Sequence, residues 1–266
     1  MPMLRSGDAQ LLYEVVGSGP DVFVLLHPFP LNHHFWTPVT ELLNTRYRVL
    51  LPDLRAHGDS EAGEGPVTMS KLADDLARLC REEHITKATF VGVSIGGYLL
   101  FEFWRRYRDH VGALVLANTR PGAETTESKA VRLQAADKVL QEGTAGFIED
   151  MLSRLLSQST RTNRPDIVQA ARRMMQKMSP DDIAAVQRGM AERPDSVATL
   201  ASINVPTLII AGEEDSIPQS EFELMRQQIA GSGLRVISDA GHYAALEKPQ
   251  EFGVMLRKFL DGLPKW

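Results

Sequence analysis

Ser94 stands between two glycines in the segment Gly92-Val93-Ser94-Ile95-Gly96. The residues before this segment are apolar and β-prone, and those after it have the apolar spacing of a helix, which predicts a strand, a sharp turn and a helix. Side chains at the two glycine positions would crowd the neighbouring backbone in such a turn. The turn would hold the serine hydroxyl above a sheet edge, beside a helix N-terminus that favours negative charge. The segment therefore predicts a nucleophilic serine.

A glycine-rich turn between a strand and a helix can also bind phosphate. A P-loop requires Gly-Lys-Ser or Gly-Lys-Thr at the turn, and neither sequence follows Gly92. The chain also lacks a Gly-x-Gly-x-x-Gly nucleotide fingerprint, a His-Glu-x-x-His motif and paired cysteines. We therefore expect neither a cofactor nor a metal ion in the site.

A serine hydroxyl is a weak nucleophile, so it requires a base and an acid that orients the base. Asp215 and His242 each come shortly after an apolar, strand-like run, residues 208–211 and 234–237. Ligands of open α/β sheets bind at the carboxyl ends of the strands, where these two side chains and Ser94 would meet. The sequence therefore makes Ser94, Asp215 and His242 candidates for a catalytic triad.

At this point the chain resembles the α/β-hydrolase superfamily, over about residues 11–260. It is most similar to small bacterial esterases, enol-lactonases, perhydrolases and carbon–carbon bond hydrolases, and its triad has the family's chain order. Five landmarks carry the resemblance: His27-Pro28-Phe29-Pro30, the segment DLRAHGDS at 53–60, the turn at Ser94, Gly212-Glu213-Glu214-Asp215, and Gly241-His242.

The resemblance implies a mostly parallel, doubly wound sheet with a helical cap inserted before the last strands. It also implies that the backbone N–H groups of Phe29 and Ile95 form the oxyanion hole. Pro28 stands where the family usually has glycine. Proline has no N–H, but it is not the expected donor, so the hole can survive this difference. Pro28 does restrict the backbone of the loop.

Other side chains compete for the same roles. Glu213 and Glu214 share an acidic turn with Asp215, which the family pattern favours as the third residue after Gly212. His57 is the main rival of His242, and the family pattern makes it a structural residue close to the site. The remaining candidates are His27, expected to brace the oxyanion loop, Asp239, expected to face its own loop, and His33, His34, His84 and His110, expected at the surface.

Strand-like and helix-like segments alternate along most of the chain, beginning with an expected edge strand at residues 10–16. Ser70 is expected to cap a helix that runs through Glu83. Between residues 121 and 200 the patterns are helical and no convincing strand occurs. We therefore expect a core domain made of residues 1–120 and 201–266, with a helical cap at 121–200. Five methionines fall in this cap, most of them expected to pack it and some to line a pocket: Met151, Met174, Met175, Met178 and Met190.

The composition narrows the range of partners. A formal net charge of −5 and a pI of about 5.8 argue against nucleic acid and anionic membranes. No apolar run is long enough to span a bilayer, and the first residues contain no apolar signal-peptide region, so a cytoplasmic location is expected. The expected partner is a small ester or lactone, and the sequence leaves monomer and homodimer open.

These observations together predict a serine hydrolase that cleaves a small carboxylic ester or lactone through an acyl-enzyme on Ser94. A carbon–carbon bond hydrolase of diketone acids, a perhydrolase and a non-catalytic binding protein stay open as alternatives. The first of these would require positively charged cap residues that face Ser94, for which Arg120 is a candidate. Haloalkane dehalogenases and epoxide hydrolases are disfavoured because their family members carry aspartate at the turn.

Overall fold

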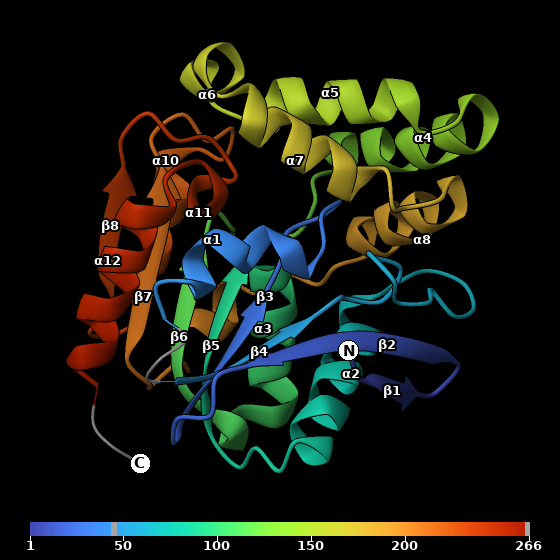
Figure 1. Ribbon diagram of the computed structural model, residues 1–266. Helices are drawn as coiled ribbons and strands as arrows, with labels where there is room; N and C mark the ends of the chain where they lie inside the picture. Colours follow the sequence, from blue (N-terminus) through green and yellow to red (C-terminus); the bar gives the residue numbers. More distant parts are fainter. Residues whose placement is uncertain (44–46, 264–266) are drawn as a thin grey trace.

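The computed structural model describes residues 1–43 and 47–263, and in this part of the chain eight strands form one sheet (Figure 1). Their order across the sheet is β1-β2-β4-β3-β5-β6-β7-β8, and every pair from β4 to β8 is parallel. The strands are β1 (Met3–Ser6), β2 (Ala9–Val16), β3 (Asp21–Leu26), β4 (Tyr47–Pro52), β5 (Ala88–Val93), β6 (Val111–Ala117), β7 (Thr207–Gly212) and β8 (Gly233–Ile237). The prediction of a mostly parallel, doubly wound sheet is confirmed. The expected core ranges include residues 44–46 and 264–266, which lie outside the described residues.

Helices cover both faces of this sheet. On β3, Val24 and Leu26 belong to one apolar cluster with α2 (Met69–Glu82) and α3 (Ile95–Tyr107), whereas Phe23 and Leu25 belong to a second cluster with α12 (Pro249–Asp261). This alternation along one strand means that both of its faces are buried, which explains the continuous apolar sequence. The helices outside the cap region are α1 (Thr37–Thr40), α2 (Met69–Glu82), α3 (Ile95–Tyr107), α10 (Gln219–Gln228), α11 (Ala244–Glu247) and α12 (Pro249–Asp261), with short 3₁₀ helices η1 (His33–Trp36) and η2 (Arg108–His110).

Two local predictions were wrong. The strand expected at residues 10–16 is not an edge strand, because β2 pairs with β4 on one side and with β1 on the other. Ser70 does not cap α2, because the helix begins two residues earlier and the side chain of Thr68 accepts from the N–H of Lys71 at 3.3 Å. The first error arose because β1 adds a strand outside β2. The second concerns a helix end, where a shift of one or two residues changes the cap.

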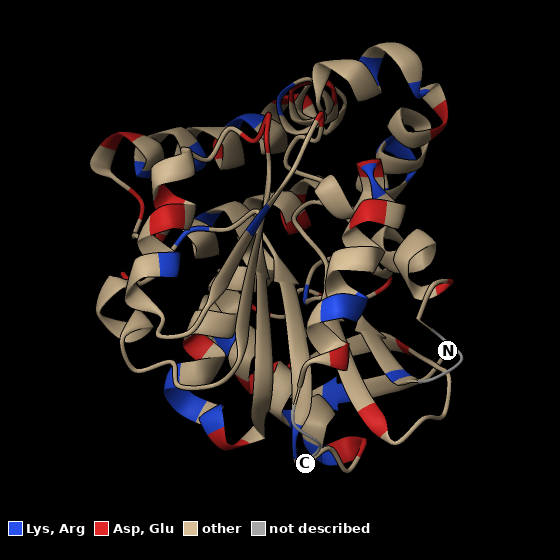
Figure 2. Ribbon diagram, turned by 90° about the vertical axis from the view of Figure 1, so that its left-hand side faces the viewer, with Lys and Arg blue, Asp and Glu red and all other residues tan. Residues whose placement is uncertain are grey.

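Charged side chains of both signs lie along the helices and outer loops, whereas β5, β6 and β7 carry none (Figure 2). The strands at the centre of the sheet are therefore uncharged, and the charged side chains lie on the helices and loops around them. Within residues 1–43 and 47–263, no helix combines the length and the apolar character needed to cross a membrane.

The chain between β6 and β7 consists of helices, and most of them lie beyond the carboxyl edge of the sheet (Figure 1). These helices are α4 (Thr126–Glu142), α5 (Ala145–Leu155), α6 (Gln158–Asn163), α7 (Pro165–Met175), α8 (Pro180–Ala191) and α9 (Val197–Leu200). Helix α8 sits tightly on the core, because a Cβ at Gly189 would lie 1.8 Å from the carbonyl oxygen of Val67. The N–H of Val67 also donates to the carbonyl of Ala185 at 3.0 Å.

The five methionines of this region are all buried in apolar clusters. Three of them pack with the α12 side of the sheet and two with the α2 and α3 side: Met151, Met174 and Met175, then Met178 and Met190. Their exposed fractions are 8% or less, which fits a packing role for each of them.

We expect Met178→Ala to lower the free energy of unfolding by about 2–5 kcal/mol, because it leaves a cavity among buried side chains. Chemical denaturation measures this change. Met3→Ala is the control, since Met3 is 48% exposed and its loss should change stability by about 0.5 kcal/mol or less. An unchanged midpoint for Met178→Ala together with a changed substrate preference would show that this side chain lines a pocket instead.

Candidate active site

The turn at Ser94 joins β5 to α3 and has the geometry that the sequence predicts. Ser94 has φ of 56° and ψ of −114°, a conformation that residues other than glycine rarely adopt. A Cβ at Gly92 would lie 2.5 Å from the carbonyl carbon of Gly96, and a Cβ at Gly96 would lie 2.6 Å from the carbonyl oxygen of Leu26. Both glycines are therefore required by close backbone contacts, and they leave Ser94 at the carboxyl end of a central strand.

Asp215 and His242 come together in a direct contact. The Nδ1 atom of His242 lies 2.8 Å from Oδ1 of Asp215, and both side chains are almost fully buried. A neutral imidazole that donates from Nδ1 to this carboxylate has its free lone pair on Nε2. Burial acts to raise the pKa of Asp215, but the charge of His242 and hydrogen bonds from His242 and Asn118 lower it below its ordinary value.

Ser94 shares this edge of the sheet with the pair, because the loops after β5, β7 and β8 leave parallel strands at the same end. Within the described residues, the hydroxyl of Ser94 has no hydrogen bond to His242. Catalytic hydrogen bonds often form only when substrate binds, so the lack of this bond does not rule out transfer of a proton between the two groups.

Asn118 supports the side chain of Asp215, and the sequence analysis did not identify it. It follows β6 with φ of 45°, and its Nδ2 donates to Oδ2 of Asp215 at 2.7 Å and to the carbonyl of Gly241 at 3.3 Å. The loops after β6, β7 and β8 are therefore joined through one amide group. In the sequence, the position of Asn118 directly after an apolar, strand-like run could have identified it as a candidate site residue.

The rival carboxylates have other partners. Glu213 accepts from the N–H of Asp239 at 3.2 Å, and Glu214 accepts from the N–H of Gln158 at 2.9 Å. The carboxylate of Asp239 lies 3.9 Å from Nζ of Lys248. Asp215 is thus the carboxylate of this group that contacts the histidine. In residues 1–43 and 47–263, there is no group of three or more His, Cys, Asp or Glu side chains that could hold a metal ion.

The loop at Phe29 lies beside the histidine loop. The hydroxyl of Tyr243, which is fully buried, donates to the carbonyl oxygen of Phe29 at 3.1 Å. Within the described residues, no protein acceptor is found for the backbone N–H of Phe29 or of Ile95. Both amides are therefore available as donors. Tyr243 was also missed by the sequence analysis, because nothing in its local sequence indicates a partner in this loop.

His27 connects the Phe29 loop to the next loop, as expected for a brace. Its Nδ1 donates to the carbonyl of Pro28 at 3.0 Å, and its Nε2 accepts from the N–H of Leu54 at 2.9 Å. The ring is fully buried, and burial together with the charge of His57 lowers the pKa of His27 to about 3.

Asp53 organises the loop that follows β4. Its Oδ1 accepts from the backbone N–H of His33 at 2.8 Å and from Nδ1 of the same residue at 2.7 Å, while Oδ2 accepts from the N–H of Asp59 at 3.0 Å. His33 was expected at the surface, and that prediction was wrong because the ring is only 2% exposed and bound to Asp53. Gly58 is required here, since a Cβ on it would lie 2.1 Å from Oδ2 of Asp53.

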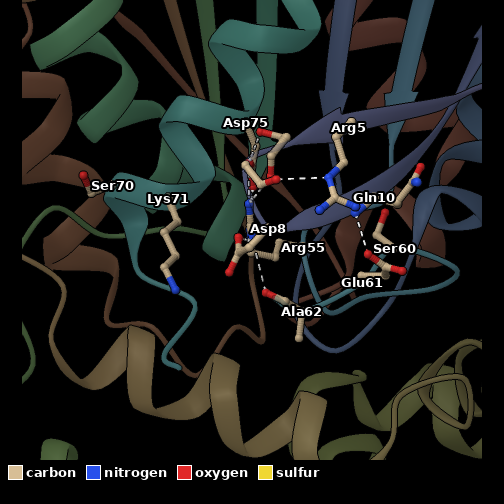
Figure 3. A network of polar contacts seen from close by, with 12 residues as sticks. Arg5, Asp8, Gln10, Arg55, Ser60, Glu61, Ala62, Ser70, Lys71 and Asp75 are labelled. Atoms are coloured by element: carbon tan, nitrogen blue, oxygen red, sulfur yellow. Dashed lines mark hydrogen bonds and ion pairs between the residues drawn. The ribbon is translucent and has the colours of Figure 1, made fainter. Parts of the chain in front are cut away.

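The buried guanidinium group of Arg55 connects the same loop to α2 through an ion pair with buried Asp75, and it also pairs with exposed Asp8 (Figure 3). Its guanidinium group contacts both oxygens of Asp75, at 2.9 and 2.8 Å, and Oδ1 of Asp8 at 2.6 Å. It also donates to the carbonyl of Ala62 at 3.2 Å. Because the charge is compensated by two carboxylates and a planar, bidentate contact, this arginine can be buried without an unpaired charge.

His57 lies in this loop and has no carboxylate as a hydrogen-bond partner. Its Nδ1 donates to the carbonyl of Arg55 at 2.9 Å, and its buried Nε2 has no partner within the described residues. The ring packs at right angles against Phe29, with centroids 5.7 Å apart. Burial lowers the pKa of His57 to about 4, so the fold favours its neutral form.

The two buried histidines predict a dependence of stability on pH. The fold lowers the pKa of His27 to about 3 and of His57 to about 4, from an ordinary value of 6.5. Between these values the unfolded chain binds more protons, so stability should fall as pH falls below about 6.5. The expected slope is on the order of 1 kcal/mol per pH unit for each histidine.

Denaturation midpoints measured between about pH 7 and pH 4.5 check this prediction. His57→Gln should show a shallower dependence than the unaltered chain, whereas His84→Gln should not, because His84 is exposed. Identical slopes for all three proteins would contradict the assignment of a neutral, buried His57.

The comparisons with known proteins agree with the fold described above. Residues 21–249 match the family described as alpha/beta hydrolase fold. A thermophilic esterase from Thermogutta terrifontis has 38% sequence identity and a TM-score of 0.92, over 95% of this chain and 93% of that one.

Two relatives have 27% identity. A putative 2-succinyl-6-hydroxy-2,4-cyclohexadiene-1-carboxylate synthase of Bacillus subtilis matches over 94% of this chain and 95% of its own length. A 3-oxoadipate enol-lactonase of Acinetobacter baylyi matches over 92% of each. The resemblance inferred from five short landmarks is confirmed, and the chain belongs to the alpha/beta hydrolase fold family.

Proposed function

We propose that this protein is a serine hydrolase that cleaves a small carboxylic ester or lactone through an acyl-enzyme on Ser94. The observation that carries the proposal is the strained turn that holds Ser94 at the same sheet edge as the buried pair of Asp215 and His242. A nucleophile, a base with a free Nε2 lone pair and an acid that orients the base are the groups that acyl transfer requires.

In the first half of the proposed reaction, Nε2 of His242 accepts the proton of the Ser94 hydroxyl while the serine oxygen attacks the substrate carbonyl. Asp215 holds the ring through Nδ1 and stabilises the imidazolium that forms. The N–H groups of Phe29 and Ile95 donate to the developing oxyanion. Donors of this kind each lower the barrier by about 2.7–4 kcal/mol in a well-studied protease.

In the second half, His242 gives its proton to the leaving alkoxide, and the acyl group stays on Ser94. Water then enters, His242 takes a proton from it, and the resulting hydroxide attacks the acyl carbonyl. Collapse of the second tetrahedral intermediate releases the carboxylic acid and returns the proton to Ser94. With a lactone, the alcohol and the acid are released as one molecule.

The similar proteins support this bond type. The Thermogutta protein is described as an esterase and the Acinetobacter protein as an enol-lactonase, and both names refer to hydrolysis of an ester linkage. Each of them matches more than nine-tenths of the present chain. The proposal therefore extends to this protein a reaction class that two full-length relatives share in their names.

We propose further that residues 121–200 form a cap domain over this site, mounted on a core of residues 1–120 and 201–266. The ring of Phe147 in α5 contacts the ring of Phe29, with centroids 5.9 Å apart. A cap residue thus touches the loop that carries one proposed oxyanion donor. Such a cap would exclude water and shape the space for the acyl group.

The alternative function, a carbon–carbon bond hydrolase, would require a positively charged residue that faces Ser94, and Arg120 was the candidate. In the structure, Arg120 donates to Glu124 at 2.9 Å, and Arg132 and Arg193 contact the same buried carboxylate at 3.1 Å each. These contacts tie together residues at the beginning and the end of the cap region. Arg120 therefore has a partner in the base of the cap, which favours the ester and lactone reaction over the alternative.

We expect the protein to hydrolyse p-nitrophenyl acetate, and Ser94→Ala to lower kcat by on the order of 10⁶ with the fold unchanged. The reason is that the substitution removes the proposed nucleophile. A panel of esters, lactones and a diketone acid, together with an assay for peracid formation, identifies the preferred substrate class.

Thermal melting of the Ser94→Ala variant is the control for folding. More than a few per cent of the activity in a variant that melts like the unaltered chain would show that the nucleophile is elsewhere. Turnover of the diketone acid alone would favour carbon–carbon bond cleavage, peracid formation alone would favour a perhydrolase, and no turnover at all would favour a binding protein.

His242→Ala should reduce kcat about as severely as Ser94→Ala, because it removes the base. His57→Ala should be much milder, since that ring donates only to a backbone carbonyl in the loop after β4. Values of kcat for the two variants, each with a melting curve, decide between the histidines. The reverse ranking would assign the base to His57.

A further inference from the structure

The linker between α5 and α6 lies directly against the loop that carries His242. The backbone N–H of His242 donates to the carbonyl of Leu155 at 2.8 Å. A Cβ at Gly241 would lie 2.7 Å from the nitrogen of Ser157 and 2.8 Å from the oxygen of Leu155. The backbones of the two segments are therefore in direct contact. A side chain at position 241, just before the proposed base, would clash with the linker, so this residue must be glycine.

A buried carboxylate bridges the same two segments. Glu247 in α11 is 3% exposed, and its Oε1 accepts from the N–H of Gly241 at 3.0 Å. Its Oε2 accepts from the N–H of Ser157 at 2.8 Å. Within the described residues, no Lys, Arg or His forms an ion pair with this group. The two amide donors are therefore what compensates the burial of the charge.

We propose that Glu247 is a positioning residue that couples the seating of the cap linker to the orientation of His242. The inference rests on the proposed function of His242 as the base. If residues 155–157 moved away, His242 would lose its bond to Leu155, and one oxygen of a buried carboxylate would lose its donor. The same carboxylate holds Gly241, so the disturbance passes to the neighbouring histidine. The linker thus helps to hold His242 in its orientation.

Glu214 offers a matched control in the same region. Its Oε2 accepts from the N–H of Gln158 at 2.9 Å, one residue beyond Ser157. Its side chain is exposed and bonds only the cap, not the histidine loop. Two carboxylates therefore contact adjacent amides of the cap, and only that of Glu247 also contacts Gly241.

The test compares E247Q with E214Q. Glutamine keeps the shape of the side chain but presents an NH₂ group to one of the two amide donors, so one bond is lost. We expect E247Q to lower kcat for p-nitrophenyl acetate by about 10- to 100-fold, as a misplacement of about 1 Å can do, with KM changed by about twofold or less. E214Q should keep both constants.

Deuterium exchange provides a readout that does not depend on turnover. E247Q should raise exchange in peptides that cover residues 155–158 and in peptides that cover 240–243, whereas E214Q should raise it only in the first. If E247Q does not fold, E247D takes its place, because it keeps the charge and withdraws it by one methylene group.

Two results would overturn the proposal. One is an equal loss of kcat in E247Q and E214Q, and the other is a lower melting temperature in E247Q with kcat and exchange at 240–243 unchanged. If the unaltered chain does not hydrolyse the ester, the proposed function fails, and the exchange pattern of the two variants still decides whether Glu247 couples the segments.

Discussion

The backbone at Ser94 is held in a strained conformation by strands on both sides of β5. Strain of this kind costs about 1–3 kcal/mol and persists only where the surroundings impose it. On one side, Gly96 lies against the carbonyl of Leu26 at the end of β3. On the other, the hydroxyl of Thr119, just after β6, donates to the carbonyl of Ser94 at 2.9 Å. Because β3, β5 and β6 are parallel, the contacts from Leu26 and Thr119 both reach the turn at Ser94. The other site residues lie around this turn.

Buried polar side chains join the loops that carry the remaining site groups. Asn118 joins Asp215 to the histidine loop, Tyr243 joins that loop to Phe29, and Glu247 joins it to Ser157 between α5 and α6. Each of these groups is buried, so leaving any one of them unpaired would cost the desolvation energy of a polar group. A network of this kind has few alternative arrangements, which is a physical basis for a preorganised site.

The sequence predicted the sheet and the turn at Ser94 because both depend on local chemistry. Short apolar runs bounded by turn residues favour buried strands, and a turn with such close contacts tolerates only glycine at Gly92 and Gly96. The sequence did not predict Tyr243, because its partner Phe29 is 214 residues away in the chain. The burial of His33 was missed for a similar reason, since its partner Asp53 lies in another loop. Contacts of this type become visible only when the loops at the sheet edge are placed together.

The central claim is that Ser94 forms the covalent intermediate, and a p-nitrophenyl phosphonate tests it most directly. Such a reagent mimics the tetrahedral intermediate and stays on the nucleophile, so its mass can be located on a peptide. We expect a stoichiometric burst of p-nitrophenol, complete loss of esterase activity and a phosphonyl group on Ser94. A chain that is unfolded before the reagent is added should carry no label. Loss of activity with the label on another residue, or full activity after labelling of Ser94, would contradict the claim.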